Sequence, residues 1–287
     1  MKSRCLSRLF FWMINKVAIQ GVKGSFHHIV SQNYFETDVD VVECLSFDTT
    51  VSNLLSCKTD AAIMAIENSI AGSIIPNYAL IDNHQLYVVG EHYLDIQHHL
   101  MALTGQNIED IKEVYSHPMA LLQCKMFFKQ WPHIKLIEDK DTAEVAQRIK
   151  ESNLLGVAAI ASDLAAKIYG LEILAHSIQT IKHNETRFVI VKRENHEIPK
   201  QEINKASLKF ELAHKHGSLA AILNAMSDCK LNLTKIQSLP KINTPWKYAF
   251  FVDVTFETYE DYDKAKAIMT IMAEEFKVLG EYKNAKL

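Results

Sequence analysis

The sequence predicts an α/β protein that carries a smaller, ferredoxin-like α+β domain at its C-terminal end. Short apolar segments alternate with amphipathic helices over residues 16–193, which is the pattern of a sheet covered by helices. The segment 61–66 is apolar at every position, as in a strand that is buried on both faces of a parallel sheet. A polar segment with one proline, residues 194–204, follows this region and is expected to be a linker.

The first region is expected to alternate between strands and helices along its whole length. Strands are expected at residues 17–19, 41–47, 61–66, 86–89, 93–103, 113–115, 135–137, 156–160 and 188–191. Helices are expected to begin near Ser25, Thr49, Pro118, Thr142 and Asp163. Residues 1–15 join basic residues to an apolar run that is too short for a signal peptide, so we interpret them as a poorly ordered extension.

The second region, residues 205–287, has the element order of a ferredoxin-like domain. Leu208, Phe210 and Leu212 alternate with polar residues, as in a strand that is buried on one face. The expected elements after this strand are a helix at 219–226, strands at 232–238 and 247–255, a helix at 261–276 and a strand at 278–282. This β-α-β-β-α-β order is typical of small binding or docking units, so we expect the chemistry to lie in the first region.

Composition excludes several classes of function. The 287 residues carry a formal net charge of -3, which gives no general attraction to nucleic acid or to an anionic membrane. No segment approaches the roughly 18 apolar residues of a membrane span. The five cysteines form no C-x-x-C pair and the histidines form no H-E-x-x-H motif. We therefore expect no metal site, no disulfide framework and a location in the reducing cytoplasm.

Polar residues follow several of the expected strands of the first region. In sheets of this kind, ligands bind beyond the carboxyl ends of the strands, where loops lead into helices. Gly21–Ser25 can bring backbone N–H groups close to an anion, although an ordinary turn explains this sequence equally well. Asn68, Ser69 and Ser73 offer neutral donors for carboxylates or hydroxyls, and capping of the strand end is their alternative role.

Two further loops complete the set of candidates. Ser116 and His117 precede Pro118, and on their own they indicate an ordinary helix start more often than a catalytic group. At the entry to the last strand, Arg187 offers a bidentate fork for a carboxylate, and Thr186 offers a hydroxyl that can donate to a leaving oxygen. We expect all of these loops to surround one pocket.

These segments together resemble the signature motifs of the prephenate dehydratase family. The matching motifs are, in order, Gly21-x-x-Gly24-Ser25-Phe26, Glu67-Asn68-Ser69-(x)3-Ser73, Ser116-His117-Pro118-(x)4-Gln123-Cys124, Ala158-Ala159-Ile160-Ala161-Ser162 and Asn184-x-Thr186-Arg187-Phe188. Residues 205–256 look like the ACT domain of the same family. The resemblance extends over residues 17–282 and leaves the N-terminal extension outside.

The resemblance implies a fold, a reaction and a set of residues. Residues 16–193 would form a bilobal catalytic domain of the periplasmic-binding-protein type, with the active site between the lobes. The reaction would be the decarboxylating dehydration of prephenate to phenylpyruvate, without metal, cofactor or covalent nucleophile. In the catalytic motif Thr186-Arg187-Phe188, Thr186 would assist the departure of hydroxide, and Arg187 would hold a carboxylate or position Thr186. The substrate would be bound by Gly24, Ser25, Asn68, Ser69, Ser73, Ser116, His117 and Gln123.

For the C-terminal region, the resemblance implies feedback regulation by phenylalanine and assembly into a homodimer or homotetramer. The residues that would bind phenylalanine at a subunit interface are His216, Gly217, Ser218, Leu219, Asn232, Leu233, Gln237 and Ser238. Gln237 and Leu239 stand where the family usually has glutamate and arginine, which removes both charges from this site. In the first region, Val22 stands where the family often has proline, and His27 where it usually has a small hydroxyl residue.

Two other functions are compatible with the same motifs. Arogenate dehydratase carries out the same chemistry on the amino-acid analogue of prephenate, and no single residue separates the two activities. An inactive phenylalanine-sensing or ligand-binding protein would keep the two lobes, but the intact Thr186-Arg187-Phe188 triplet argues against it. Turnover of prephenate, of arogenate or of neither distinguishes the three functions.

Overall fold

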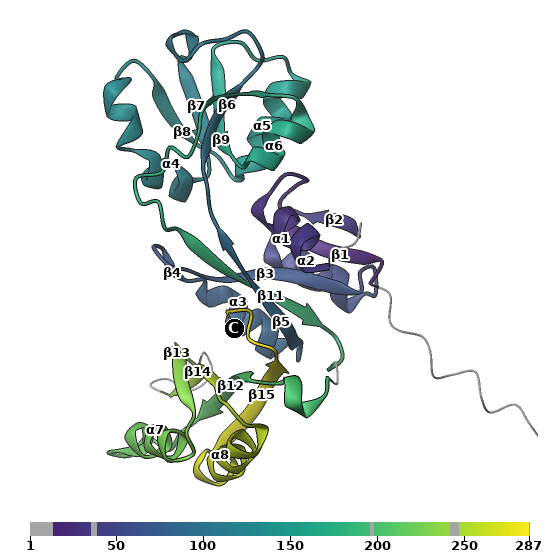
Figure 1. Ribbon diagram of the computed structural model, residues 1–287, viewed down its shortest axis with the longest axis vertical. Helices are drawn as coiled ribbons and strands as arrows, with labels where there is room; N and C mark the ends of the chain where they lie inside the picture. The colour runs from purple at the N-terminus through teal and green to yellow at the C-terminus, as the bar shows by residue number, and fades with distance from the viewer. Residues whose placement is uncertain (1–13, 36–38, 196–197, 242–246, 287) are drawn as a thin grey trace, which may run out of the picture.

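The computed structural model describes residues 14–35, 39–195, 198–241 and 247–286. Its strands form three sheets with helices packed on them, and the three units follow one another along the long axis of the molecule (Figure 1). The first two units are the lobes of a bilobal α/β fold, and the third, residues 205–282, is called the C-terminal unit below. No helix within the described ranges is long and apolar enough to cross a membrane. Most of the expected N-terminal extension lies outside the described residues.

The first lobe contains the sheet β2-β1-β3-β11-β5, with β4 paired to β3. Its strands are β1 (Lys16–Gln20), β2 (Asp40–Cys44), β3 (Ala61–Asn68), β4 (Gly72–Ser73), β5 (Tyr87–Asp95) and β11 (Glu185–Lys192). Its helices are α1 (Phe26–Phe35), α2 (Phe47–Leu55) and α3 (Ile75–Asn83). The apolar segment 61–66 forms most of the buried strand β3, as predicted. The expected parallel pairing holds for β1 with β2 and β3, but it is wrong for β11, which returns from the second lobe and runs antiparallel to both β3 and β5.

The second lobe contains the sheet β10-β6-β9-β7-β8. Its strands are β6 (His99–Ala102), β7 (Glu113–Ser116), β8 (Lys135–Glu138), β9 (Val157–Ala161) and β10 (Glu172–Ala175). Its helices are α4 (Pro118–Cys124), α5 (Thr142–Glu151) and α6 (Asp163–Tyr169), and short 3-10 turns lie at Ile108–Asp110 and Phe127–Gln130. Asp141 caps α5 by accepting from the N–H groups of Ala143 and Glu144 at 2.8 and 2.9 Å, which fixes where this helix begins.

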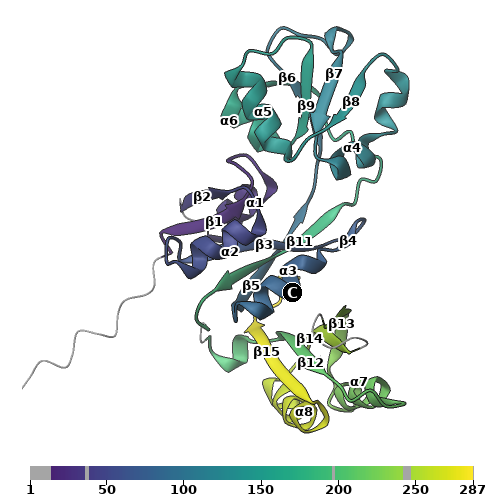
Figure 2. The same ribbon diagram turned by 180° about the vertical axis from the view of Figure 1, so that it is seen from behind.

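The chain passes between the lobes twice, at residues 96–98 and 176–184 (Figures 1 and 2). The single strand expected at 93–103 is therefore two strands, β5 and β6, in different sheets. The two crossing segments bond to each other, because the N–H of Ile96 donates to the carbonyl of Asn184 at 2.6 Å and that of Ile178 donates to the carbonyl of His98 at 2.8 Å. These bonds hold the two lobes together at the place where both crossings meet.

The C-terminal unit has the order β-α-β-β-α-β and the sheet β13-β14-β12-β15. Its elements are β12 (Lys205–Glu211), α7 (Ser218–Asp228), β13 (Asn232–Pro240), β14 (Tyr248–Thr255), α8 (Tyr259–Met272) and β15 (Glu275–Tyr282), preceded by a 3-10 turn at Lys200–Glu202. The helix expected at 261–276 ends earlier, because Phe276 pairs with Phe210 in the ladder between β15 and β12. Residues 242–246, between β13 and β14, lie outside the described residues.

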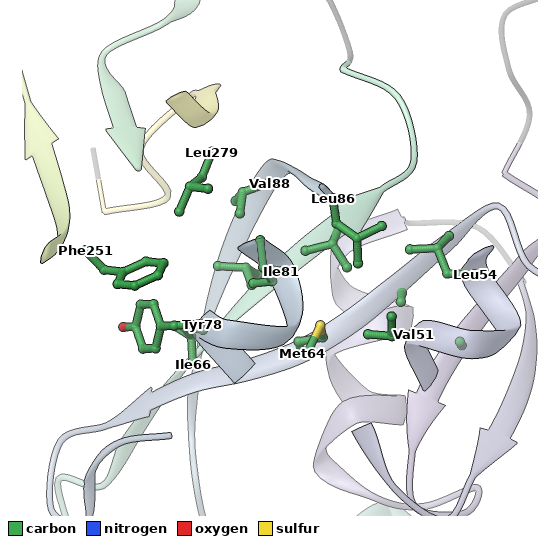
Figure 3. Packing of buried hydrophobic residues seen from close by; sticks show 14 of the residues in the cluster. Val51, Leu54, Met64, Ile66, Tyr78, Ile81, Leu86, Val88, Phe251 and Leu279 are labelled. Carbon is green, nitrogen blue, oxygen red and sulfur yellow. The ribbon is translucent and has the colours of Figure 1, made fainter. Parts of the chain in front are cut away.

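The C-terminal unit packs directly on the first lobe. Phe251 and Leu279 lie against Tyr78, Ile81 and Val88 of the first lobe in one continuous apolar cluster (Figure 3). The Tyr78 and Phe251 rings meet edge to face, with centroids 5.5 Å apart. Gly280 of β15 approaches β5 so closely that a Cβ there would lie 2.0 Å from the carbonyl oxygen of Val88. Only glycine allows this contact.

Candidate active site

A cleft of about 600 Å³ lies between the two lobes, beside the crossing segments. Side chains of the first lobe, the second lobe and both crossings line it, and they include Ser25, Phe26, His27, Phe47, Asp48, Asn68, Asn77, His98, His117, Gln123, Lys140, Asp141, Asn184, Thr186 and Phe188. Loops that are distant in the sequence thus line one cavity, because they lie at the ends of the two sheets that face each other.

Asn68 and Thr186 form the central polar contact of the cleft. They are paired in the register of β3 and β11, and Asn68 Nδ2 donates to Thr186 Oγ1 at 2.9 Å. The orientation of the Asn68 amide is fixed, because its Oδ1 accepts from the backbone N–H groups of Ile70 and Ala71 at 3.0 and 2.8 Å. Since the hydroxyl oxygen of Thr186 already accepts from Asn68, the hydroxyl hydrogen is available to a ligand in the cleft.

Three further side chains continue this contact across the cleft. Asn68 Nδ2 also donates to Asn184 Oδ1 at 2.7 Å, and Asn184 Nδ2 donates to Gln123 Oε1 at 2.9 Å. His98 Nε2 lies 2.9 Å from the same Gln123 oxygen, and because that oxygen can only accept, His98 carries its proton on Nε2. Burial lowers the pKa of His98 to about 4, so the imidazole is neutral near pH 7. The network fixes the Gln123 amide and leaves its Nε2 donors for a ligand.

Helix N-termini surround the cleft and favour an anionic ligand. The first residues of α1, α2 and α5 all belong to the cleft wall. Unpaired N–H groups and the helix dipole make such ends attractive to carboxylates. Lys140, just before α5, is the only lysine or arginine among the described residues that line the cleft. Anion binding here must therefore rely on backbone donors and neutral side chains together with one ammonium group.

An aromatic wall faces these polar groups. The rings of His27 and Phe188 meet edge to face with centroids 5.0 Å apart, and His27 lies 5.5 Å from Phe47 in the same way. Burial lowers the pKa of His27 to about 3, so its imidazole is a neutral ring at neutral pH. A cleft with one apolar aromatic wall and one wall of amide and hydroxyl donors suits a polar, ring-containing anion.

Several of the predicted site residues line this cleft, and they are Ser25, Asn68, His117, Gln123, Thr186 and Phe188. His117 also caps α4, since its Nδ1 accepts from the N–H of Met119 at 3.2 Å. Ser25 is almost fully buried and accepts from the N–H of His28 at 3.3 Å at the start of α1. Both residues thus combine the structural role that their sequence context favours with a place at the cleft wall.

Arg187 lies outside the cleft, and the predicted role of holding a substrate carboxylate is wrong. Successive side chains of a strand point to opposite faces, so Arg187 points behind the sheet while Thr186 points into the cleft. The guanidinium is 5% exposed and donates to Glu91 Oε2 at 2.7 Å and to Asp253. Its remaining nitrogen donates to the Tyr282 hydroxyl at 2.8 Å. All three nitrogens of the guanidinium have partners behind the sheet, so Arg187 does not reach a ligand in the cleft.

Gly24 and Ser116 have structural roles and do not line the cleft. Gly24, at φ +90°, lies so close to the second lobe that a Cβ would be 2.8 Å from the Cα of Ala165. Its carbonyl accepts from Ser162 Oγ at 2.5 Å, which ties the first turn to α6. Ser116 is fully buried and donates to the carbonyl of Ile160 at 2.7 Å. The predicted contact of these two residues with substrate is therefore wrong.

Ser69 and Ser73 also lie away from the cleft. Ser69 Oγ accepts from the N–H of Glu185 at 3.0 Å, beside a second hollow lined by Tyr93 and Arg187. Ser73 Oγ accepts from Lys235 Nζ of the C-terminal unit at 2.9 Å. Of the predicted motif after β3, only Asn68 faces the cleft, since the chain turns back there to form β4.

Residues 17–196 match the family model described as prephenate dehydratase. The chain belongs to the prephenate dehydratase family. "Arogenate dehydratase/prephenate dehydratase 2, chloroplastic" of Arabidopsis thaliana is 37% identical to it over 280 residues, which covers 93% of this chain and 72% of the relative.

Solved structures share the fold of this family member. Prephenate dehydratase from Arthrobacter aurescens in complex with L-Phe superposes with a TM-score of 0.85 at 24% identity, over 94% of this chain and 90% of that one. A protein described as "a novel type of quorum quenching acylases" superposes with a TM-score of 0.85 at 25% identity, over 94% of this chain and 98% of that one. These likenesses establish the bilobal, periplasmic-binding-protein-like fold of this prephenate dehydratase family member together with its C-terminal unit.

Sequence reasoning missed several cleft residues of this prephenate dehydratase family member. Asn184 belongs to a motif that was recognised, yet its bridging position follows only from the fold. His98 lies in a crossing segment that was predicted as part of a strand. Lys140 lies just before the helix that was expected to begin near Thr142, and its positive charge at that helix start was the available signal.

The residues predicted to bind phenylalanine lie in two places of the C-terminal unit. His216, Gly217, Ser218 and Leu219 form the turn into α7 and its first residues, where Gly217 has a φ of +81°. Asn232, Leu233, Gln237 and Ser238 lie on β13, which is an edge strand of the sheet.

Proposed function

We propose that this enzyme converts prephenate to phenylpyruvate in the cleft between the lobes. The observation that carries the proposal is the Asn68–Thr186 contact, because it leaves the Thr186 hydroxyl hydrogen to point at a leaving oxygen. In the reaction the bond to the ring carboxylate breaks and carbon dioxide leaves. The released electron pair enters the ring, and the C–O bond at the opposite ring carbon breaks. The hydroxyl departs as hydroxide with a hydrogen bond from Thr186, and it takes a proton from the solvent to become water. Aromatisation of the ring supplies the driving force.

The chain's own groups can orient such a substrate without further chemistry. The starts of α1 and α2 and the ammonium of Lys140 would hold the two carboxylates, because Asp141 already accepts from the first N–H groups of α5. Phe188, His27 and Phe47 would contact the ring, whose edge and face fit an apolar wall. The Gln123 amide and the Thr186 hydroxyl would then supply neutral donors at the polar end. Orientation and hydrogen bonding of this kind are enough for a reaction whose product is aromatic.

Arogenate is the second candidate substrate, and it differs from prephenate by an ammonium group where prephenate has a keto oxygen. Two carboxyl groups line the cleft, those of Asp48 and Asp141, and either could accept from an ammonium group. Burial raises the pKa of Asp141 above its ordinary value. The name of the Arabidopsis relative includes both activities, which supports arogenate as a second candidate.

Steady-state kinetics with both substrates test the proposal. We expect turnover of prephenate to phenylpyruvate, followed by the absorbance of the product, with a higher kcat/KM than for arogenate. A higher kcat/KM for arogenate would replace the substrate assignment and leave the site assignment intact. Absence of turnover with both substrates, with either one still bound, would favour the inactive ligand-binding alternative.

For the C-terminal unit we propose an ACT-type regulatory domain that binds phenylalanine and joins subunits into a dimer or tetramer. Its β-α-β-β-α-β order and the L-Phe complex of the Arthrobacter structure support this role. The turn at Gly217 and the edge strand β13 would form the phenylalanine site. The domain boundaries proposed from the sequence, 16–193 for catalysis and 205–287 for regulation, follow the same division.

The enzyme is proposed to act in the cytoplasm, as its composition suggests. Cys44, Cys57, Cys124 and Cys229 are free thiols, which suits a reducing compartment. Prephenate, phenylalanine and further copies of the chain would be its partners.

A further inference from the structure

The strands that carry the cleft residues also carry charged residues on their opposite face. Thr186 lies in the cleft, and the next residue on β11, Arg187, points away from it. Asn68 likewise lies in the cleft, and the preceding residue on β3, Glu67, lies outside it. Thr186 pairs with Asn68 and Arg187 pairs with Glu67 in the register of the two strands. A displacement of Arg187 or Glu67 would therefore move the backbone next to Thr186 and Asn68.

Both outer residues are bound by the C-terminal unit. Arg187 forms an ion pair with Asp253 of β14, with both side chains almost fully buried. Glu67 forms an ion pair with Lys235 of β13 at 2.7 Å, and Lys235 is 8% exposed. Lys235 and Asp253 are themselves register partners in the C-terminal sheet. Two adjacent residues of one sheet thus hold two adjacent residues of the other.

The second contact of Lys235 reaches the same region of the first lobe. Lys235 Nζ also donates to Ser73 Oγ of β4 at 2.9 Å, and it lies 5.4 Å from the centroid of the Tyr78 ring. β4 pairs with the end of β3, where Glu67 is opposite Ser73. The ammonium group therefore holds both sides of the turn that carries Asn68.

The other charges of this interface keep Arg187 ionised and in place. Burial alone would disfavour the guanidinium, but Asp253, Tyr282 and Glu91 together raise its pKa well above the ordinary value. Glu91 is also bound by Lys205 Nζ at 2.8 and 2.9 Å, so its second charge partner comes from β12. Asp253 accepts from Ser207 Oγ in addition to Arg187. Burial would raise the pKa of Asp253, but Arg187, Ser207 and Lys205 together hold it below the ordinary value. A buried network of this kind allows few alternative geometries.

We propose that Arg187 and Glu67 are positioning residues for Thr186 and Asn68, and that Asp253 and Lys235 of the C-terminal unit hold them in register. The name "charge quartet" is used here for Glu67, Arg187, Lys235 and Asp253. The quartet makes the geometry of the Asn68–Thr186 hydrogen bond depend on how the C-terminal unit is seated. This inference rests on the proposed role of Thr186 in turnover. It gives Arg187, which does not line the cleft, an indirect role in catalysis.

The Lys235–Glu67 pair is the better place to test the quartet, because Glu67 is 38% exposed whereas Arg187 and Asp253 are almost fully buried. Lys235→Gln is expected to lower kcat about tenfold with KM changed less than about twofold, since a displacement smaller than 1 Å at a catalytic group is costly. Lys235→Arg keeps the charge and is expected to recover most of kcat. Glu67→Gln combined with Lys235→Gln is expected to be no worse than either single variant, because both remove the same pair.

Lys247→Gln is the matched control. Lys247 lies just before β14 and forms an ion pair with Glu274 at 3.1 Å within the C-terminal unit, with both side chains about half exposed. Its loss removes a lysine of the same unit without touching the first lobe, so kcat should be that of the wild type. Wild-type kcat in Lys235→Gln, or an equal loss in both variants, would overturn the proposal.

A readout that is independent of turnover separates this proposal from the proposed function. In full-length protein labelled at threonine methyl groups, the Thr186 resonance should shift in Lys235→Gln and stay in place in Lys247→Gln. A shifted Thr186 resonance in a protein that turns over neither substrate would support the positioning role and contradict the proposed function. An unchanged Thr186 resonance and wild-type turnover in Lys235→Gln would contradict the positioning role and leave the proposed function standing.

Discussion

Asn68 donates a hydrogen bond to Thr186 Oγ1 at 2.9 Å, across the pairing of β3 and β11. The bond also settles the direction of the hydroxyl, because the Asn68 oxygen is already used by two backbone N–H groups. Thr186 therefore accepts from one side and can donate toward the cleft on the other. The proposed chemistry and most of the predictions below depend on this polarity.

Asn68→Asp tests the direction of that bond. The new carboxylate would accept where the amide donates, so the Thr186 hydroxyl hydrogen would turn toward it and away from the substrate. We expect kcat to fall by roughly two orders of magnitude, as measured by steady-state kinetics. Circular dichroism should also show a lower melting temperature, because the carboxylate would face Asn184 Oδ1, which accepts from the Asn68 amide in the wild type. Asn184→Asp, one step further from the hydroxyl, is the comparison and should lose less. A variant at Asn68 with near-normal kcat would show that the polarity of the bond is irrelevant.

Ser116→Ala and Ser73→Ala test whether these two serines lie outside the substrate site. Ser116 is buried within the second lobe, and Ser73 contacts the C-terminal unit. Ser116 is fully buried and donates to the Ile160 carbonyl, so its removal should lower the free energy of unfolding by about 1–2 kcal/mol while KM stays unchanged. Ser73 contacts Lys235 outside the cleft, and its removal should also leave KM unchanged. Denaturant unfolding and Michaelis profiles check both. A several-fold rise of KM in either variant would return that serine to the substrate site.

Acidification should destabilise the protein partly through His27. Burial lowers the folded-state pKa of His27 from 6.5 to about 3, so between these values the unfolded chain binds more protons than the folded one. Stability must then rise with pH in this window and fall as the pH drops below 6.5, by about 1.4 kcal/mol per pH unit for one such group. His27→Gln, which cannot titrate, should show a shallower decline between pH 6.5 and 4 in denaturant unfolding. Equal slopes for the variant and the wild type would mean that His27 titrates normally.

Phenylalanine should raise the melting temperature if the C-terminal unit binds it. A ligand that binds only the folded state stabilises that state in proportion to the logarithm of its concentration over Kd. Thermal unfolding with millimolar L-phenylalanine, with D-phenylalanine as the control, measures this effect. An unchanged melting curve would mean that Gln237 and Leu239 have abolished the site, and it would leave the catalytic proposal untouched.

Much of the site followed from the sequence because loops after the strands of an α/β fold share one edge. Asn68 and Thr186 were predicted together for that reason, and they do meet, whereas Gln123 was predicted only from the family motif. The direction of Arg187 was available from the alternation of side chains in a strand, which forbids neighbouring residues from facing the same cleft. The predicted carboxylate contact ignored this rule.

Other features could not be read from local sequence. The partner of Ser73 is Lys235, which lies 162 positions further along the chain, so its role depends on where the C-terminal unit packs. Asn184 bridges the cleft because it lies in one of the two segments that cross between the lobes. The sequence did not reveal these crossings, because residues 93–103 were expected to form a single strand and instead form parts of two, β5 and β6. The mixed sheet has the same origin, because the returning strand β11 inserts between β3 and β5.

The kcat of Thr186→Ala relative to Thr186→Ser and to the wild type tests the central claim most directly. A hydroxyl that donates to the leaving oxygen is a transition-state contact, and its loss should lower kcat by roughly two to four orders of magnitude with little change in KM. Thr186→Ser keeps the donor and should stay within about tenfold of the wild type. Near-normal turnover of prephenate by Thr186→Ala, in a protein that folds normally, would contradict the account.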